Sequence, residues 1–144
     1  MTKSLVLASS LVVIIFLDQI TKNWADQNMV IRGWVKLIPY DNYGVLFGIP
    51  LPYYVTIVLS TIFLIILLYL FVRYQNMPKI FYWGLALSVA GGVSNLVDRF
   101  NYGFVRDFID LAILPVFNLA DVAIITGVIF IIWGVIHYEQ PQKI

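Results

Sequence analysis

The chain has no cysteine and only one histidine, His137. The absence of cysteine excludes disulfides, thiolate nucleophiles and cysteine-ligated metal sites. A single histidine near the C-terminus leaves no Ser–His–Asp arrangement and no histidine-based metal motif. Any catalysis by this chain therefore falls to carboxylates.

Charge is also scarce, at 12% of residues against about 25% in soluble domains. The hydrophobic fraction is 61% and the mean hydropathy is +0.89, which predicts an integral membrane protein. A length of 144 residues accommodates about four spans of ~20 residues and no separate soluble domain. The net charge of +1, without a run of Lys or Arg, offers nothing for nucleic acid to bind.

The apolar segments predict an all-α membrane protein with one domain, residues 1–144, and four up-and-down transmembrane helices. We expect the spans at about residues 4–24, 52–72, 80–97 and 118–138, and extracytoplasmic loops at 25–51 and 98–117. Partial alternation at 34–38 and 104–110 predicts short strands, so we expect a small β-containing cradle in these loops. The first segment begins like a signal peptide, but polar residues follow it in place of a small-residue cleavage site, which indicates a retained span.

Two further patterns concern packing and orientation. Gly84, Ser88 and Gly92 recur at steps of four in the third span, a spacing that lets a neighbouring helix approach closely. Arg73 and Lys79 place two positive charges in one tight turn without an acid, and short loops dominate the positive-inside rule. We therefore expect both termini in the cytoplasm and the opposite face outside.

Successive spans reverse direction, so the ends of the first and third spans share a side with the start of the fourth. Asp18 and Lys22 lie four residues apart near the end of the first span, on one helix face. They are explained equally well as a self-neutralising pair and as part of a site. Near the end of the third span, Asn95, Asp98 and Arg99 also share a face. The planar fork of Arg99 suits a carboxylate or a substrate carbonyl, whereas Asp98 also fits a polar helix end that joins loops.

Asn118 and Asp121 open the fourth span with the same N-x-x-D spacing. Helix capping accounts for Asn118, but an acid inside the apolar edge, facing other acids, indicates function. In the preceding loop we expect Asp107 to be functional, because it shares a strand face with apolar residues, and Asp110 to be a solvated carboxylate.

Two carboxylates brought together in a low-dielectric site cannot both ionise, so one acts as acid while the other acts as base on water. This is the solution used by aspartic peptidases, and it needs no metal or other cofactor. Periodicity does not decide whether the partner of Asp121 is Asp98 or Asp107. The neighbours of Asp98 hold it ionised, whereas the apolar surroundings of Asp107 raise its pKa into a useful range, which favours Asp107.

Five ordered motifs cover nearly the whole chain. They are Asp18-Gln19-x-x-Lys22, Asn42-x-Gly44-x-x-Phe47, Asn95-x-x-Asp98-Arg99, Val105-x-Asp107-Phe108-x-Asp110 and Phe117-Asn118-x-Ala120-Asp121. Together they closely resemble the bacterial lipoprotein signal peptidase, the type II signal peptidase of the aspartic class.

This resemblance implies an aspartic endopeptidase of the bacterial inner membrane. Its substrates would be diacylglyceryl-modified prolipoproteins, which it would cleave just before the lipid-modified cysteine. Its other partners would be membrane lipids, and we expect a monomer. By motif position, Asp107 and Asp121 correspond to the catalytic pair, and Asn42 and Arg99 to substrate-holding residues. The other residues expected to bind substrate or support the site are Asp18, Lys22, Asn95, Asp98 and Asn118. One departure is Ser94, where the family usually has glycine.

Two rival interpretations remain at this point. Membrane carboxylates also mark ion paths, so a small proton- or cation-handling protein is the main alternative. Such a path would distribute polar groups through the membrane depth, whereas here the acids stop at one face. A non-catalytic assembly subunit is the third interpretation, and it would need no paired acids.

Overall fold

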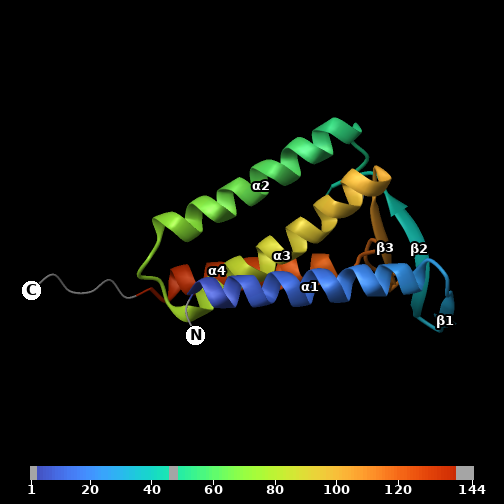
Figure 1. Ribbon diagram of the computed structural model, residues 1–144. Helices are drawn as coiled ribbons and strands as arrows, with labels where there is room; N and C mark the ends of the chain where they lie inside the picture. The colour runs from blue at the N-terminus through green and yellow to red at the C-terminus, as the bar shows by residue number, and fades with distance from the viewer. Residues whose placement is uncertain (1–2, 46–48, 139–144) are drawn as a thin grey trace, which may run out of the picture.

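The computed structural model describes residues 3–45 and 49–138 (Figure 1). The chain forms mostly helices with a small sheet. Its elements are α1 (Lys3–Ala25), β1 (Val30–Arg32), β2 (Val35–Asn42), α2 (Tyr53–Arg73), α3 (Lys79–Tyr102), β3 (Val105–Asp110) and α4 (Leu119–Ile136). The two loops predicted to contain strands supply β1 and β2 from one and β3 from the other.

Within the described part of the chain, three helices are long and apolar enough to cross a membrane, namely α2, α3 and α4. These three helices fit a membrane protein and are candidates for three of the four expected spans. The predicted loop 98–117 begins later than expected, because α3 continues through Asp98 and Arg99 to Tyr102. Gly103 then adopts a φ of 85°, a left-handed conformation that suits glycine, and turns the chain into β3.

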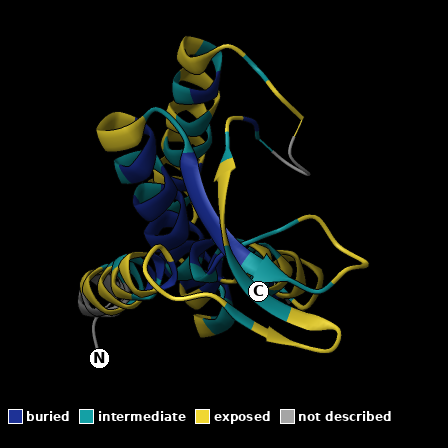
Figure 2. Cartoon of the chain, turned by 90° about the vertical axis from the view of Figure 1, so that its right-hand side faces the viewer, coloured by how far each residue is buried: buried dark blue, intermediate teal, exposed yellow. Residues whose placement is uncertain are grey.

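The central helix is α3, which contacts α1, α2 and α4. Figure 2 shows that buried residues concentrate on α3 and β3, while the outer surfaces are exposed. By contrast, α2 buries only Thr56 and Leu67 and presents apolar side chains over the rest of its surface. An apolar helix with so little buried surface is suited to contact with lipid.

Close packing between α3 and α4 depends on small residues. A side-chain carbon at Gly84 would lie 2.5 Å from the carbonyl oxygen of Gly127, and one at Gly91 would collide with the carbonyl oxygen of Ala120. Ser88 also faces α4, donating a hydrogen bond to the Ile124 carbonyl at 3.4 Å. The predicted row of small residues therefore continues at position 91, since Gly92 instead faces Leu64 of α2.

The sheet lies at the end of the bundle where α1 and α3 finish and α4 begins (Figure 1). Its strand order is β1-β2-β3, and both pairings are antiparallel. Tyr40 pairs with Asp107, and Asn42 pairs with Val105. This register brings the end of β2 beside the acid of β3 and so places the sheet over the polar ends of the helices.

Candidate active site

Asp107 is buried at the middle of β3, with 1% of its surface exposed. One carboxylate oxygen accepts a hydrogen bond from Asn42 Nδ2 at 2.8 Å, and the other accepts one from Asn118 Nδ2 at 2.6 Å. Burial and the neighbouring charge of Asp121 raise the pKa of Asp107 to about 7, although both amides oppose the shift. A carboxyl with this pKa keeps its proton near neutral pH and can serve as an acid.

Asp121 lies in the first turn of α4 and forms a reciprocal capping box with Asn118. Its backbone N–H donates to Asn118 Oδ1 at 2.8 Å, and its Oδ2 accepts from the Asn118 backbone N–H at 3.2 Å. The second oxygen, Oδ1, accepts from Asn95 Nδ2 at 2.8 Å. Capping and membership of the polar cluster are therefore both properties of the same carboxylate.

Two amides connect the acids. Asn118 Nδ2 donates to Asp107 and also to Asn95 Oδ1 at 3.1 Å, while Asn95 Nδ2 donates to Asp121. Asn95 Oδ1 also accepts from Lys22 Nζ at 3.0 Å. With two donors on its oxygen, the Asn95 amide must direct its N–H towards Asp121.

Asp18, Lys22 and Asp98 are all fully buried. Lys22 Nζ lies 2.7 Å from Asp18 Oδ2 and 2.9 Å from Asp98 Oδ2. Asp18 Oδ1 also accepts from the backbone N–H of Ala120 at 2.9 Å. The expected Asp18–Lys22 pair is thus more than self-neutralising, because it ties α1 to α3 and to the start of α4.

Arg99 is buried at the end of α3, but its fork does not grip a carboxylate in the described structure. It donates to the Gly44 carbonyl at 3.0 Å and to the Asn95 carbonyl at 3.4 Å. Gly44 in turn donates its N–H to Asn42 Oδ1 at 2.9 Å. Arg99 and Asn42 are therefore joined through the backbone that follows β2, beside Asp107.

Asp110 lies apart from this cluster. It forms an ion pair with Lys36 at 3.3 Å and accepts from the Ala112 backbone N–H at 2.7 Å. These contacts, the Ala112 hydrogen bond first, lower the pKa of Asp110. The expectation of a solvated carboxylate is corrected here, because the Asp110 side chain is only 15% exposed and is held by Lys36 and the Ala112 N–H.

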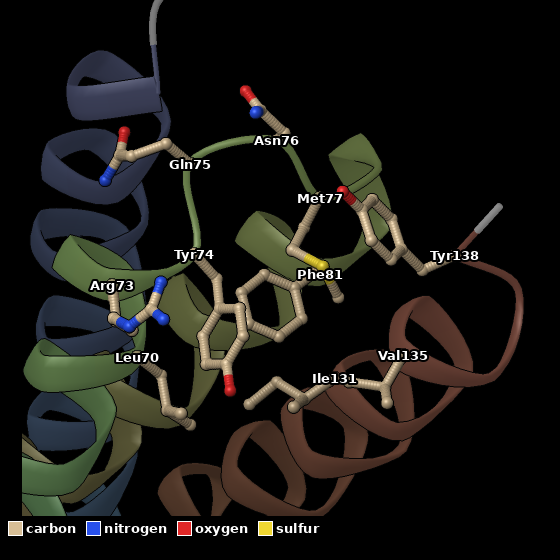
Figure 3. A pocket seen from close by; sticks show the side chains of 10 residues that line it. All are labelled: Leu70, Arg73, Tyr74, Gln75, Asn76, Met77, Phe81, Ile131, Val135 and Tyr138. Carbon is tan, nitrogen blue, oxygen red and sulfur yellow. The ribbon is translucent and has the colours of Figure 1, made fainter. Parts of the chain in front are cut away.

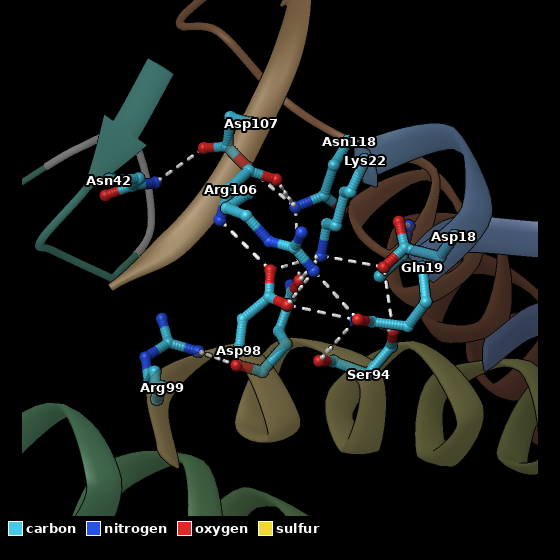
Figure 4. A network of polar contacts seen from close by, with 12 residues as sticks. Asp18, Gln19, Lys22, Asn42, Ser94, Asp98, Arg99, Arg106, Asp107 and Asn118 are labelled. Carbon is cyan, nitrogen blue, oxygen red and sulfur yellow. Dashed lines mark hydrogen bonds and ion pairs between the residues drawn. The ribbon is translucent and has the colours of Figure 1, made fainter. Parts of the chain in front are cut away.

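The predicted residues Asp18, Lys22, Asn42, Asn95, Asp98, Asp107, Asn118 and Asp121 all join one network of polar contacts. Figure 4 shows the part of this network around Asp98, Asp107 and Asn118. The members that were not predicted as site residues include Gln19, Asn23, Asp26, Ser94 and Arg106. Gln19 Nε2 donates to Ser94 Oγ and Asp98, and Arg106 donates to Gln19, Asn23, Asp26 and Asp98. The available signal was the polar face at the end of α1, where residues 19, 22 and 23 recur at helical spacing and residue 26 follows just beyond the helix.

Ser94 is accommodated through hydrogen bonding. Its hydroxyl donates to Asp18 Oδ2 at 2.7 Å and accepts from Gln19 Nε2 at 3.1 Å, and the residue is fully buried. The serine thus adds a bond between α1 and α3 at a position where the resemblance leads us to expect glycine.

A cavity of about 380 Å³ lies at the other end of the bundle, where α2 turns into α3 and α4 finishes (Figure 3). The described residues that line it include Arg73, Tyr74, Phe81 and Val135, and none of the described lining residues is an Asp or Glu. It is therefore separate from the acid cluster. In the described part of the chain, no group of three or more His, Cys, Asp or Glu side chains is arranged to hold a metal ion.

Residues 10–137 match the model of the family described as Signal peptidase (SPase) II. The chain belongs to this family. A lipoprotein signal peptidase of Pelotomaculum thermopropionicum is 34% identical, with 91% of each chain aligned. One from Clostridium tetani is also 34% identical, with 90% of this chain and 93% of the relative covered.

A solved structure of a bacterial membrane enzyme superposes with a TM-score of 0.81 at 28% identity, covering 95% of this chain and 94% of the other. Signal peptidase II membership confirms the resemblance inferred from the five motifs and the prediction of a membrane protease of the aspartic class. It does not favour the ion-handling alternative.

Proposed function

We propose that this chain removes the signal peptide from diacylglyceryl-modified prolipoproteins, cleaving before the lipid-modified cysteine. The observation that carries the proposal is the pairing of Asp107 with Asp121 through Asn118 and Asn95 in a buried polar cluster. Family membership and the names of the relatives support the substrate class.

In the proposed mechanism, Asp107 carries the proton and Asp121 is the ionised partner. Asp121 takes a proton from a water molecule as the water oxygen attacks the scissile carbonyl carbon, and the carbonyl π electrons move onto its oxygen. Protonated Asp107 donates a hydrogen bond to that oxygen and then its proton to the leaving amine as the C–N bond breaks. Asn118 contacts both acids, so it keeps their relative position fixed during the reaction.

Arg99 and Asn42 are proposed to hold the substrate. Arg99 already donates to a backbone carbonyl, that of Gly44, which demonstrates the chemistry that a substrate carbonyl would use. Asn42 contacts Asp107 through one amide atom and Gly44 through the other. Asp18, Lys22, Asn95, Asp98 and Asn118 would support these groups rather than touch the reacting atoms.

We further infer that α1 is the fourth span. A helix of 23 residues is about 35 Å long, enough for a hydrocarbon core of ~30 Å. Its exposed side chains between residues 12 and 17 are apolar. Four spans place both termini on one side, which we assign to the cytoplasm of the bacterial inner membrane, with the acid cluster facing outward. One chain supplies all the proposed site residues, so the proposed activity needs no second subunit, and we propose that the enzyme works as a monomer.

The test is incubation of the purified protein with a diacylglyceryl-modified prolipoprotein and, separately, with its unmodified precursor. Mass spectrometry should find a new N-terminus at the modified cysteine in the first reaction and little product in the second. Equal cleavage of the two precursors would reject the proposed specificity, and no cleavage of either would reject the proposed activity.

A further inference from the structure

Arg106 immediately precedes Asp107 on β3, and its side chain is 7% exposed. Neighbouring side chains on a strand leave the backbone in opposite directions, so Arg106 faces away from the contacts of Asp107. Figure 4 shows its guanidinium directed at Asp98 and Gln19 while Asp107 faces Asn42 and Asn118. Arg106 therefore has no direct place in the acid pair.

The contacts of Arg106 fasten β3 to two helices. Towards α3, its backbone N–H donates to Asp98 Oδ2 at 3.0 Å, and Nη2 donates to Asp98 Oδ1 at 2.9 Å. Towards α1, Nη2 donates to Gln19 Oε1 at 2.8 Å, and Nη1 donates to Asn23 Oδ1 at 2.6 Å and Asp26 Oδ2 at 3.1 Å.

The guanidinium also stacks at the end of α3. Its central carbon lies 4.3 Å from the centre of the Tyr102 ring, a cation–π distance. Tyr102 is the last residue of α3, and only Gly103 and Phe104 separate that helix from β3. The Arg106 guanidinium, carried by β3, therefore contacts both the end of α3 and α1.

Such a clamp matters because β3 is the last strand of the sheet order and has only β2 as a ladder partner. On the other side of β3, Ile109, which lies two residues after Asp107, forms an isolated β-bridge with Phe117. The position of the Asp107 carboxyl between Asn42 and Asn118 consequently depends on how firmly the strand is held at residue 106.

We propose that Arg106 is a positioning residue, which fastens β3 to α1 and α3 and so holds the Asp107 carboxyl in its working place. The inference rests on the proposed function. A guanidinium is suited to this task, because its planar fork reaches acceptors on two helices, whereas a lysine ammonium offers one point of contact.

The test compares Arg106→Gln and Arg106→Lys with wild type in cleavage of the lipid-modified precursor. Arg106→Gln should lower kcat about 10- to 100-fold, as expected for a displaced catalytic group, with little change in KM. Arg106→Lys should recover part of the rate, since its ammonium still reaches Asp98. The matched control is Arg32→Gln, which removes the same charge from an exposed position on β1 and should behave as wild type.

The pH profile separates positioning from a general loss of folded protein. Charged groups face Asp107 from α4 (Asp121), α1 (Lys22) and α3 (Arg99), and burial is the largest cause of its raised pKa. A displaced Asp107 carboxyl changes its burial and its distance from these charges, so the alkaline limb of kcat should move in Arg106→Gln. Fewer folded molecules would reduce the rate without moving the limb.

A folded Arg106→Gln enzyme with wild-type kcat and pH profile would overturn the inference, as would a rate loss matched by lost folded protein with an unmoved limb. If Arg106→Gln does not fold, Arg106→Lys and Asp26→Ala decide, because Asp26 is a half-exposed partner of the same guanidinium. Both should show smaller losses in the same direction, and wild-type behaviour in both overturns the inference. A wild-type enzyme that cleaves nothing would instead reject the proposed function.

Discussion

Asp107 and Asp121 are held in different ways, although they belong to one cluster. Asp107 lies on a strand and accepts from two side-chain amides, whereas Asp121 starts a helix and accepts from one backbone N–H and one amide. Asp98, a fully buried acid of the same cluster, lies against Lys22 and Arg106 and is neutralised by them. An acid paired with two cations is a poor proton donor, which supports the proposed assignment of Asp107 as the partner of Asp121.

Replacing either proposed catalytic acid with asparagine should therefore abolish cleavage while leaving the fold intact. We expect Asp107→Asn and Asp121→Asn each to lower kcat at least about 10²- to 10⁴-fold, the usual contribution of acid–base catalysis. Asp98→Asn should act mainly on thermal stability, because it leaves Arg106 without a buried counter-charge and removes one of the two carboxylates that contact Lys22. Substantial turnover by Asp107→Asn beside a folded but inactive Asp98→Asn would move the pair to Asp98 and Asp121.

The raised pKa of Asp107 makes two quantities depend on pH. Because this group keeps its proton until about pH 7, kcat should fall as the pH rises through that value and the acid of the pair is lost. Between pH 3.8 and about 7 the native state also binds more protons than the unfolded chain, so the stability should fall as the pH rises. Rate profiles and thermal melts in detergent measure both, and Asp107→Asn should remove the second dependence. A melting temperature that rises over this interval would contradict the assignment.

At the scale of elements, the α3–α4 contact transmits position to the site. A side-chain carbon added at Gly91 would collide with the carbonyl oxygen of Ala120, the residue just before Asp121, whereas one at Gly92 would meet the flexible end of Leu64 at 2.9 Å and the Phe63 ring at 3.5 Å. The two glycines therefore offer a matched pair of substitutions with the same change in helix propensity.

Gly91→Ala should reduce activity strongly, because the added carbon must push the first turn of α4 away from α3. Gly92→Ala should keep near wild-type activity, since the Leu64 side chain can rotate. Measurement of kcat and melting temperature for both variants tests this expectation. Equal activity in the two variants would mean that the α3–α4 distance does not set the position of Asp121.

The helices, the strands and most of the site could be predicted from sequence, because apolar runs, alternation and polar residues at segment ends are local patterns. The sequence pattern extends the row of small residues to Gly92, four residues after Ser88. Because a helical turn has 3.6 residues, the residue that faces α4 at this level is Gly91. Nothing local in the sequence indicates that Arg106 folds back onto Asp98. Bonds such as Asp18 to the Ala120 N–H, 102 residues apart, arise only from tertiary packing.

At the scale of the whole molecule, polar and apolar parts are separated along the bundle. The acid cluster and the sheet occupy one end, and the turn with Arg73 and Lys79 lies at the other. This separation is consistent with the proposed orientation of the protein in the membrane, with the acid cluster facing outward.

The absence of cysteine makes that orientation directly measurable. Arg32→Cys and Asn76→Cys each introduce one thiol at an exposed position, on the sheet and on the α2–α3 turn respectively. A membrane-impermeant maleimide should label position 32 in spheroplasts and position 76 only after the membrane is opened. The reverse pattern would place the acid cluster in the cytoplasm.

The bond from Asp18 to the Ala120 N–H also has a consequence for biosynthesis. Helix α1 carries one partner, and α4, which is synthesised later, carries the other together with Asp121. A nascent chain that lacks α4 has neither Asp121 nor this contact. With the proposed acid pair, a translation product that stops before α4 would be an inert membrane fragment rather than an unregulated protease.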